Sequence, residues 1–318
     1  FYATLTVEAG PGPLRIRHAK IRSQDEAMAV GEVADTPLCA VWSALWSLRT
    51  WLSAGERLGV DDDPALTARC RAILARGYDL AALERGDGGL TTTIGDPRPW
   101  GRQKHPVQLN PIAFVPLPEI ADHYPPVAAS WRRRLDLTRD AREPRSYGWT
   151  FGEFTLATAR MRDGAAVAAD LDLVQPARFA DAEWLQFYES SCVHGWQHKK
   201  PYYITTTGLY LQALTDCVLQ DWRGVIDLFA AVLPAWEGQR IEFRDLRTLD
   251  GLHVDGAWDA GHFTVSLRAS HATAQRLRVS RRGARIVVRQ GGRERRLVGD
   301  EEIALAWQAG EVVTVDGE

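Results

Sequence analysis

The chain has 318 residues, of which 45% are hydrophobic and 25% are charged, enough apolar sequence for one large core or two moderate ones. A formal net charge of −3 argues against a general nucleic-acid binder. No apolar run is long enough to suggest a membrane span, and the four cysteines show neither a CxxC pair nor zinc-ligand spacing. We therefore predict a soluble protein without a metal or other cofactor, with a periplasmic or secreted location favoured over a cytoplasmic one.

The first 33 residues are expected to lead into a helical domain. The chain begins at Phe1 without a methionine, so we expect a fragment of a longer protein. From Ala34 to Leu58 a dense apolar and aromatic face predicts a helix. Trp42, Trp46 and Trp51 lie at helical spacing in this segment and are predicted to be core residues.

A second helix is predicted from Pro64 to about Leu83, because proline is favourable in the first turn. The polar, Gly-rich stretch over residues 86–111 predicts a long loop, and loops of this length in compact domains are usually functional. Sugar pockets need aromatic faces and hydrogen-bonding side chains. The loop supplies both kinds, and its candidate substrate-binding residues are Trp100, His105, Gln108 and Asn110.

Further helices are predicted over residues 112–122, 127–139, 150–162, 164–173 and 182–189. The last helix is predicted from Leu209 to Trp222, with Thr205 to Thr207 as N-cap hydroxyls and Gly224 as a C-cap. Helices paired through short turns suit an α/α toroid. We assign residues 34–224 to this toroid.

Residues 225–318 predict an antiparallel, β-sandwich-like domain. Apolar residues alternate along 252–258 and 262–267, as in half-buried strands. Turns are predicted at Asp255-Gly256 and Ala260-Gly261, and a hairpin around Gly291-Gly292. The predicted class is therefore α plus β, with a helical domain followed by a β-domain.

Four motifs carry a resemblance to known enzymes: YGWTFGEFTLATARMRDG from Tyr147, GLYLQALTDCVLQ from Gly208, VLPAWEG from Val232 and LDGLHVDGAWDAGHFTVSL from Leu249. With these motifs the chain resembles the C-terminal portion of the six-hairpin, (α/α)6-barrel glycoside hydrolases. The likeness is closest to the family 95 α-L-fucosidases and galactosidases, and family 65 is more distant. It implies a partial (α/α)6 toroid, its first helices preceding Phe1, and an activity on glycosidic bonds.

The resemblance also implies a catalytic Glu in a loop before a barrel helix. Ser23-Gln24-Asp25-Glu26 is the nearest match, although it lacks the Pro and Asn of the family's motif. Glu26 is thus a candidate general acid, with Glu32 and Asp35 competing for the role. The alternative is that Asp25 and Glu26 are exposed loop acids.

The family's catalytic Asp falls where this chain has Thr205 to Thr207, so the second catalytic group would come from elsewhere. Glu153 and Glu189 are the candidates. Glu153 lies among Trp149, Phe151 and Phe154, surroundings that favour a protonated carboxyl. Its alternative is a helix-surface Glu.

The loop over residues 189–203 is the richest candidate site, because it places aromatic and polar side chains just before the last predicted helix. With Trp149, its candidate substrate-binding residues are His194, Trp196, His198, Tyr202 and Tyr203. The two histidines lack the helix and the Glu of zinc peptidases, which argues against a metal.

These features predict a glycoside hydrolase that acts on a poly- or oligosaccharide by an inverting acid–base mechanism, in which two carboxyls lie about 6.5–9.5 Å apart. One alternative is a polysaccharide lyase that removes a proton next to a uronate carboxylate, with Tyr202, Tyr203, His194 and Asn110 in its site. The other alternative is a carbohydrate-binding protein without catalysis.

Overall fold

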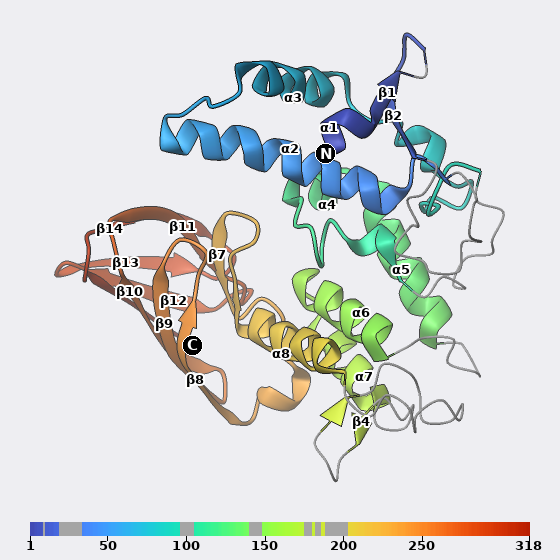
Figure 1. Ribbon diagram of the computed structural model, residues 1–318. Coiled ribbons are helices and arrows are strands. Elements are labelled where there is room, and N and C mark those ends of the chain that lie inside the picture. Colours follow the sequence, from blue (N-terminus) through green and yellow to red (C-terminus); the bar gives the residue numbers. More distant parts are fainter. Residues whose placement is uncertain are drawn as a thin grey trace. The chain divides into compact units, whose positions relative to one another are not determined.

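The computed structural model describes residues 1–8, 10–18, 34–95, 105–139, 148–174, 180–181, 186–187 and 203–318. The chain forms two compact units, residues 1–150 and residues 151–318. Figure 1 shows helices in both units and a set of strands in the second. This content agrees with the predicted α plus β class. The (α/α)6 toroid and the domain boundaries after residues 33 and 224 stay predictions.

The first unit combines a small sheet with several helices. Its elements are α1 (Tyr2–Leu5), β1 (Thr6–Glu8), β2 (Leu14–His18), β3 (Ala34–Asp35), α2 (Leu38–Leu58), α3 (Pro64–Arg76), the 3-10 turns η1 (Ala81–Leu83) and η2 (Val107–Leu109), α4 (Pro118–His123), α5 (Pro125–Arg139) and the start of α6 (Gly148–Arg160). The strands pair in the order β1-β2-β3. Ile16 in β2 is fully buried, so the segment before α2 adds to the core of this unit.

Helix α2 begins at Leu38, four residues later than predicted, because a residue that precedes proline, here Thr36 before Pro37, avoids helical dihedrals. Trp42 is fully buried, as predicted. The prediction is wrong for Trp46 and Trp51, whose side chains are 43% and 39% exposed. The buried stripe of α2 is narrower than its aromatic content suggests, and it runs through Leu38, Val41, Trp42, Leu45 and Leu48.

Helix α3 begins at Pro64 as predicted, and the carboxylate of Asp63 accepts a hydrogen bond from the Leu66 N–H at 2.9 Å. The helix ends at Arg76 rather than near residue 83, because Gly77 adopts a left-handed φ of 72°. Residues 112–122 are not one helix. Turns lead to α4, which starts only at Pro118.

The helical part of the second unit contains the rest of α6, α7 (Gly164–Val174), β4 (Ala180–Asp181), β5 (Gln186–Phe187) and α8 (Ile204–Val218). The helix predicted over 182–189 is wrong at residues 186–187, which pair with β4 as a strand. Helix α8 has Tyr203 at its N-cap, so Thr205 to Thr207 lie inside the helix and do not cap it. The helix ends before Trp222 because the next residues join a sheet.

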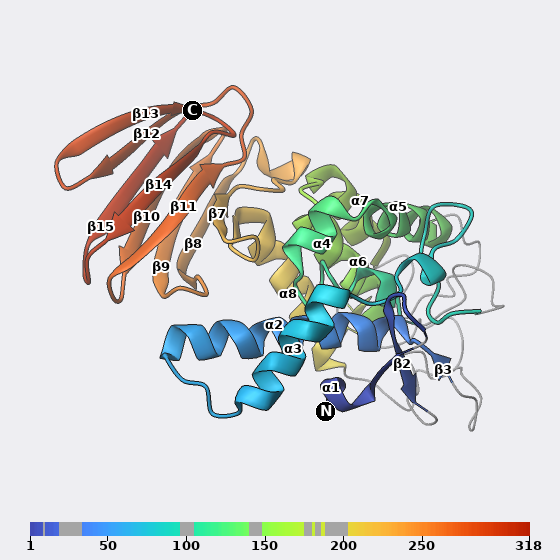
Figure 2. The same ribbon diagram turned by 90° about the horizontal axis from the view of Figure 1, so that it is seen from above.

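The remaining strands form two sheets. They are β6 (Leu219–Gln220), β7 (Val225–Leu228), β8 (Arg240–Arg247), β9 (Leu252–Asp259), β10 (His262–Ala269), β11 (Thr273–Val279), β12 (Arg285–Gln290), β13 (Arg293–Val298), β14 (Glu302–Trp307) and β15 (Val312–Gly317). One sheet has the order β13-β12-β15-β10-β9-β8 and the other β14-β11-β7-β6. Every pair in these sheets is antiparallel except β7 with β11. Figure 2 shows the strands from a second side.

The two sheets bury one common core. Side chains alternate along β9 and β10 as predicted, so that Val254, Trp258, Phe263 and Val265 face inward. Phe229 packs against Trp258 and Phe263, with ring centroids 5.3 and 4.9 Å apart. The buried face of the second sheet completes the core with Leu277, Val279, Ile303, Leu305 and Trp307.

The turns follow the predictions in two places out of three. Ala260-Gly261 turns the chain between β9 and β10, and Gly291-Gly292 turns it between β12 and β13. Asp255-Gly256 is not a turn and lies within β9. A Cβ at Gly256 would meet the Phe243 ring at 2.3 Å, so this glycine admits an aromatic ring instead of bending the chain.

The carboxyl end of α6 is held by side chains from the segment after α8. The Ala159 and Arg160 carbonyls accept hydrogen bonds from Gln220 Nε2 and Arg223 Nη1, each at 2.7 Å. Arg160 Nε lies 2.6 Å from the buried carboxylate of Asp216. Helix-terminal carbonyls need such partners, since the helix itself offers none.

Asp227 in β7 is a second buried carboxylate that joins helix and sheet. Its Oδ2 lies 2.6 Å from Arg278 Nη2 in β11 and 3.0 Å from Arg162 Nη2 after α6. Burial raises the pKa of Asp227 to about 6, while a hydrogen bond from Ser280 and the nearby guanidinium charges oppose the shift.

We expect Gly164→Ala to lower the free energy of unfolding by about 1–3 kcal/mol. Gly164 opens α7, and a Cβ there would lie 2.1 Å from the Val232 carbonyl oxygen. The matched control is Gly208→Ala in α8, where a Cβ meets nothing within 4 Å and should stabilise the helix by about 0.5–1 kcal/mol. Urea unfolding measures both, and equal effects would refute the close approach.

We expect Asp227 to lower the free energy of unfolding as the pH rises from about 4 to about 6. The pKa of its folded form, about 6, exceeds the ordinary value of 3.8, so in this window the folded chain holds a proton that the unfolded chain has lost. The loss is at most about 3 kcal/mol. Urea unfolding of the wild type and of Asp227→Asn across this window isolates the contribution, and a pH-independent difference between them would contradict it.

Candidate functional site

The structure describes six of the predicted site residues. Five of them, Glu153, His105, Gln108, Asn110 and Trp149, lie in or next to the two segments at η2 and α6, and Tyr203 precedes α8. Seven predicted site residues lie outside the described residues: Glu26, Trp100, Glu189, His194, Trp196, His198 and Tyr202. The roles of all thirteen remain proposals.

His105, Phe114 and Trp149 form an aromatic cluster in the first unit. The Trp149 Nε1–H donates a hydrogen bond to His105 Nδ1 at 2.8 Å. The indole also stacks on Phe114, with centroids 5.1 Å apart and an interplanar angle of 18°. Because an indole nitrogen can only donate, His105 Nδ1 must be the acceptor and Nε2 carries the ring proton. All three side chains are half-buried, which suits an apolar platform with a polar edge.

Gln108 and Asn110 lie beneath this part of the chain and do not line its surface. Both are almost fully buried. Gln108 Nε2 donates to the Leu90 carbonyl at 3.1 Å, and the Leu90 N–H donates to Ser130 Oγ at 3.0 Å. Gln108 therefore connects η2 to the segment around Leu90. The Asn110 carbonyl accepts from Val115 N–H at 2.8 Å and closes the following turn.

Glu153 lies on α6 and is 1% exposed, so the structure excludes the alternative of a helix-surface acid. Its helix neighbours Phe151 and Phe154 are also buried. Helix α6 approaches α8 closely at the preceding position, since a Cβ on Gly152 would lie 3.0 Å from Leu209 Cβ. A carboxyl in such surroundings is shielded from water.

Tyr203 is the N-cap of α8, and Tyr210 lies inside this helix. The Tyr203 N–H donates to the Phe187 carbonyl at 3.1 Å, and the Tyr203 side chain is half-buried. Tyr210 packs in a small core with Phe151 and Val174, and its ring stacks on Phe187 at a centroid distance of 4.6 Å. Burial raises the pKa of the Tyr210 phenol above its ordinary value.

Among the residues described, no group of three His, Cys, Asp or Glu side chains is placed to hold a metal ion. Within the same part of the chain, no helix has the length and apolar character needed to cross a membrane.

No protein-family model matches this chain, and no curated protein matches it. Among solved structures, the chain is similar to three glycosidases. An α-L-rhamnosidase from Dictyoglumus thermophilum matches 95% of this chain at 10% identity and a TM-score of 0.44. A GH127 β-L-arabinofuranosidase from Geobacillus stearothermophilus T6 matches 88% at 14% identity and a TM-score of 0.25. A GH30 endoxylanase from Clostridium papyrosolvens C71 matches 25% at 10% identity and a TM-score of 0.20.

This chain spans 33% of the rhamnosidase, 41% of the arabinofuranosidase and 23% of the endoxylanase. With TM-scores below 0.5, these likenesses carry no argument about the site.

Sequence reasoning missed Phe114, which completes the aromatic cluster. Its only signal in the sequence is its position four residues after Asn110, in a turn that was predicted to be helical. Sequence reasoning named His105 and Trp149 separately and did not predict that they touch, because 44 residues separate them.

We expect Trp149→Phe to remove the indole N–H that donates to His105 Nδ1. Nitrogen-15 NMR of the imidazole should show the Nε2–H tautomer in the wild type and a mixture of tautomers in the variant. The control is Phe114→Leu, which removes the stacking ring but keeps the donor. An Nδ1–H tautomer in the wild type would contradict the observed hydrogen bond.

Proposed function

We propose that the protein is a glycoside hydrolase that cleaves a glycosidic bond of an oligo- or polysaccharide by an inverting acid–base mechanism. The observation that carries this proposal is the buried carboxyl of Glu153, four residues after Trp149 in α6. Residues four apart lie on the same face of a helix. One turn of α6 thus combines an aromatic ring suited to sugar stacking with a shielded carboxyl.

Glu153 is assigned the role of general acid. An acid that protonates a leaving oxygen must carry its proton before the reaction, and burial among apolar side chains disfavours the charged carboxylate. A glycosidic oxygen reaches Glu153 only when side chains that cover it move aside, as happens in sites that close over a substrate. The glycan would provide the binding energy for this opening.

Inversion requires a second carboxyl that activates water, about 6.5–9.5 Å from the first. Glu26 and Glu189 are the proposed candidates for this base, and both lie outside the described residues. The aromatic cluster of His105, Phe114 and Trp149 is the proposed contact for the apolar face of a sugar ring.

We expect Glu153→Gln to lower the rate of reducing-sugar release at least about 100-fold, since general acid catalysis contributes that much or more. The assay uses a panel of neutral and uronic-acid glycans, and the melting temperature reports folding. The matched control is Asp170→Asn, another buried carboxyl in the second unit, which accepts from Thr158 Oγ1 at 3.4 Å. It should change stability without a comparable loss of rate.

Three outcomes would contradict the proposal. Full activity of a folded Glu153→Gln variant would exclude Glu153 as the acid, and Glu26→Gln and Glu189→Gln would then be tested in the same assay. Ultraviolet absorbance of an unsaturated uronide would instead identify a lyase. Glycan binding without turnover of any glycan would identify a carbohydrate-binding protein.

A further inference from the structure

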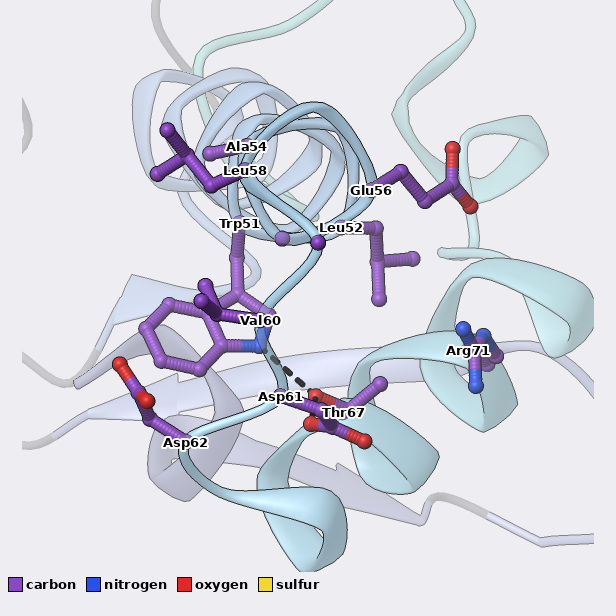
Figure 3. A pocket seen from close by; sticks show the side chains of 12 residues that line it. Trp51, Leu52, Ala54, Glu56, Leu58, Val60, Asp61, Asp62, Thr67 and Arg71 are labelled. Atoms are coloured by element: carbon purple, nitrogen blue, oxygen red, sulfur yellow. Dashed lines mark hydrogen bonds between the residues drawn. The ribbon is translucent and has the colours of Figure 1, made fainter.

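A pocket of about 340 Å³ lies at the carboxyl end of α2, within the first unit. The end of α2, the turn after it and the start of α3 enclose it, and Figure 3 shows its side chains. Its volume is at the lower end of the range for small-ligand sites, about 300–1,000 Å³. The 21 residues of α2 place it roughly 30 Å from the amino end of that helix.

Trp51 forms one wall, and a chain of hydrogen bonds fixes its ring. The Trp51 Nε1–H donates to Thr67 Oγ1 at 3.2 Å, and Thr67 Oγ1 donates to Asp61 Oδ1 at 2.7 Å. Figure 3 shows the indole directed toward Thr67 and Asp61. Since the indole N–H is already satisfied inside the protein, what the 39% exposed side chain offers a ligand is its ring surface.

The turn after α2 is built to keep the pocket in place. The Val60 N–H donates to the Gly55 carbonyl at 3.0 Å, and Gly59 adopts a left-handed φ of 67°. A Cβ at position 55 would lie 3.0 Å from the Val60 carbonyl oxygen, so a glycine there permits the turn to fold back against the helix. Val60 and Leu58 remain exposed and give the pocket an apolar rim.

The polar groups of the pocket both accept and donate hydrogen bonds. Glu56, Asp61 and Asp62 bring three carboxylates against one guanidinium, that of Arg71, for a net charge of −2. Within the described part of the chain, the side chains of Glu56, Asp62 and Arg71 make no hydrogen bond or ion pair with another residue. Figure 3 places Asp62 beside the indole, with Glu56 and Arg71 on the opposite side.

We propose that this pocket is a second glycan-binding site, one that holds a neutral sugar ring against Trp51. A sugar ring has an apolar face for the indole and hydroxyls that donate to carboxylates and accept from Arg71. The net negative charge repels uronic acids. A cationic ligand would interact favourably with the indole and the carboxylates. It would be repelled by Arg71, however, and it would offer this guanidinium no hydrogen-bond acceptor. This argument does not require Glu153 to be a catalytic acid.

Affinity gel electrophoresis of the full chain tests this site, with gels that contain galactomannan, xyloglucan or polygalacturonate. We expect a neutral polysaccharide to retard the wild type and Trp51→Ala to raise the dissociation constant at least about tenfold. The matched control is Trp46→Ala, which removes an equally exposed indole of the same helix that does not line the pocket. Its retardation should equal that of the wild type.

Thr67→Val provides a second variant, because it keeps the pocket's shape and removes the hydroxyl that orients Trp51. We expect it to weaken retardation, and melting temperatures identify any variant that fails to fold. The site is refuted if no neutral polysaccharide retards the wild type, if only polygalacturonate does, if tetramethylammonium chloride abolishes the retardation, or if folded Trp51→Ala binds normally. Reducing-sugar release measured on the same samples keeps this result separate from the test of the hydrolase.

Discussion

The second unit depends on how the carboxyl end of α6 is held. The last carbonyls of this helix find their donors beyond its end: the N–H groups of residues 161–163 cap three of them, Gln220 adds a second donor to Ala159, and Arg223 donates to Arg160. Arg160 and Arg162, at the same end, reach the buried carboxylates of Asp216 and Asp227. Buried charges are tolerated only when they are paired in this way. The carboxyl end of α6, the helix that carries Glu153, is therefore held by groups on α8 and on the segments that follow it.

Local sequence predicted the elements whose pattern is repeated over many residues. Alternation along β9 and β10 was enough to identify their buried faces, because each inward residue meets the same core. Short signals failed where a distant residue decides the outcome. Asp255-Gly256 has the composition of a turn, yet the ring of Phe243 from the neighbouring strand needs the space at Gly256. Thr205 to Thr207 have side chains suited to capping, yet they lie inside α8, because the helix already begins after Tyr203.

In the candidate site, too, the sequence predicted the residue types but not their tertiary surroundings. Sequence patterns identified the residue types that sugar chemistry needs at η2 and α6, and the structure brings His105 and Trp149 into contact. Patterns could not distinguish an exposed amide from a buried one, because the burial of Gln108 and Asn110 depends on tertiary packing that the local sequence does not encode. Trp51 was misjudged for the opposite reason. Helical spacing places it near the apolar stripe, but the buried residues of α2 stop at Leu48, and the ring of Trp51 lies beyond them at the surface.

In the two sheets of the second unit, the one parallel pair joins β7 to a strand that comes much later in the chain, β11. Strand β7 has its partner about 50 residues later, and the Arg278 and Ser280 groups that receive Asp227 arrive with that partner. In a ribosome-bound chain that ends before β11, the Asp227 carboxylate lacks its partners Arg278 and Ser280, and the edge of β7 that pairs with β11 is uncovered. Contacts of such long sequence separation form slowly. During synthesis, the edge of β7 that faces β11 therefore stays unpaired until β11 has been made.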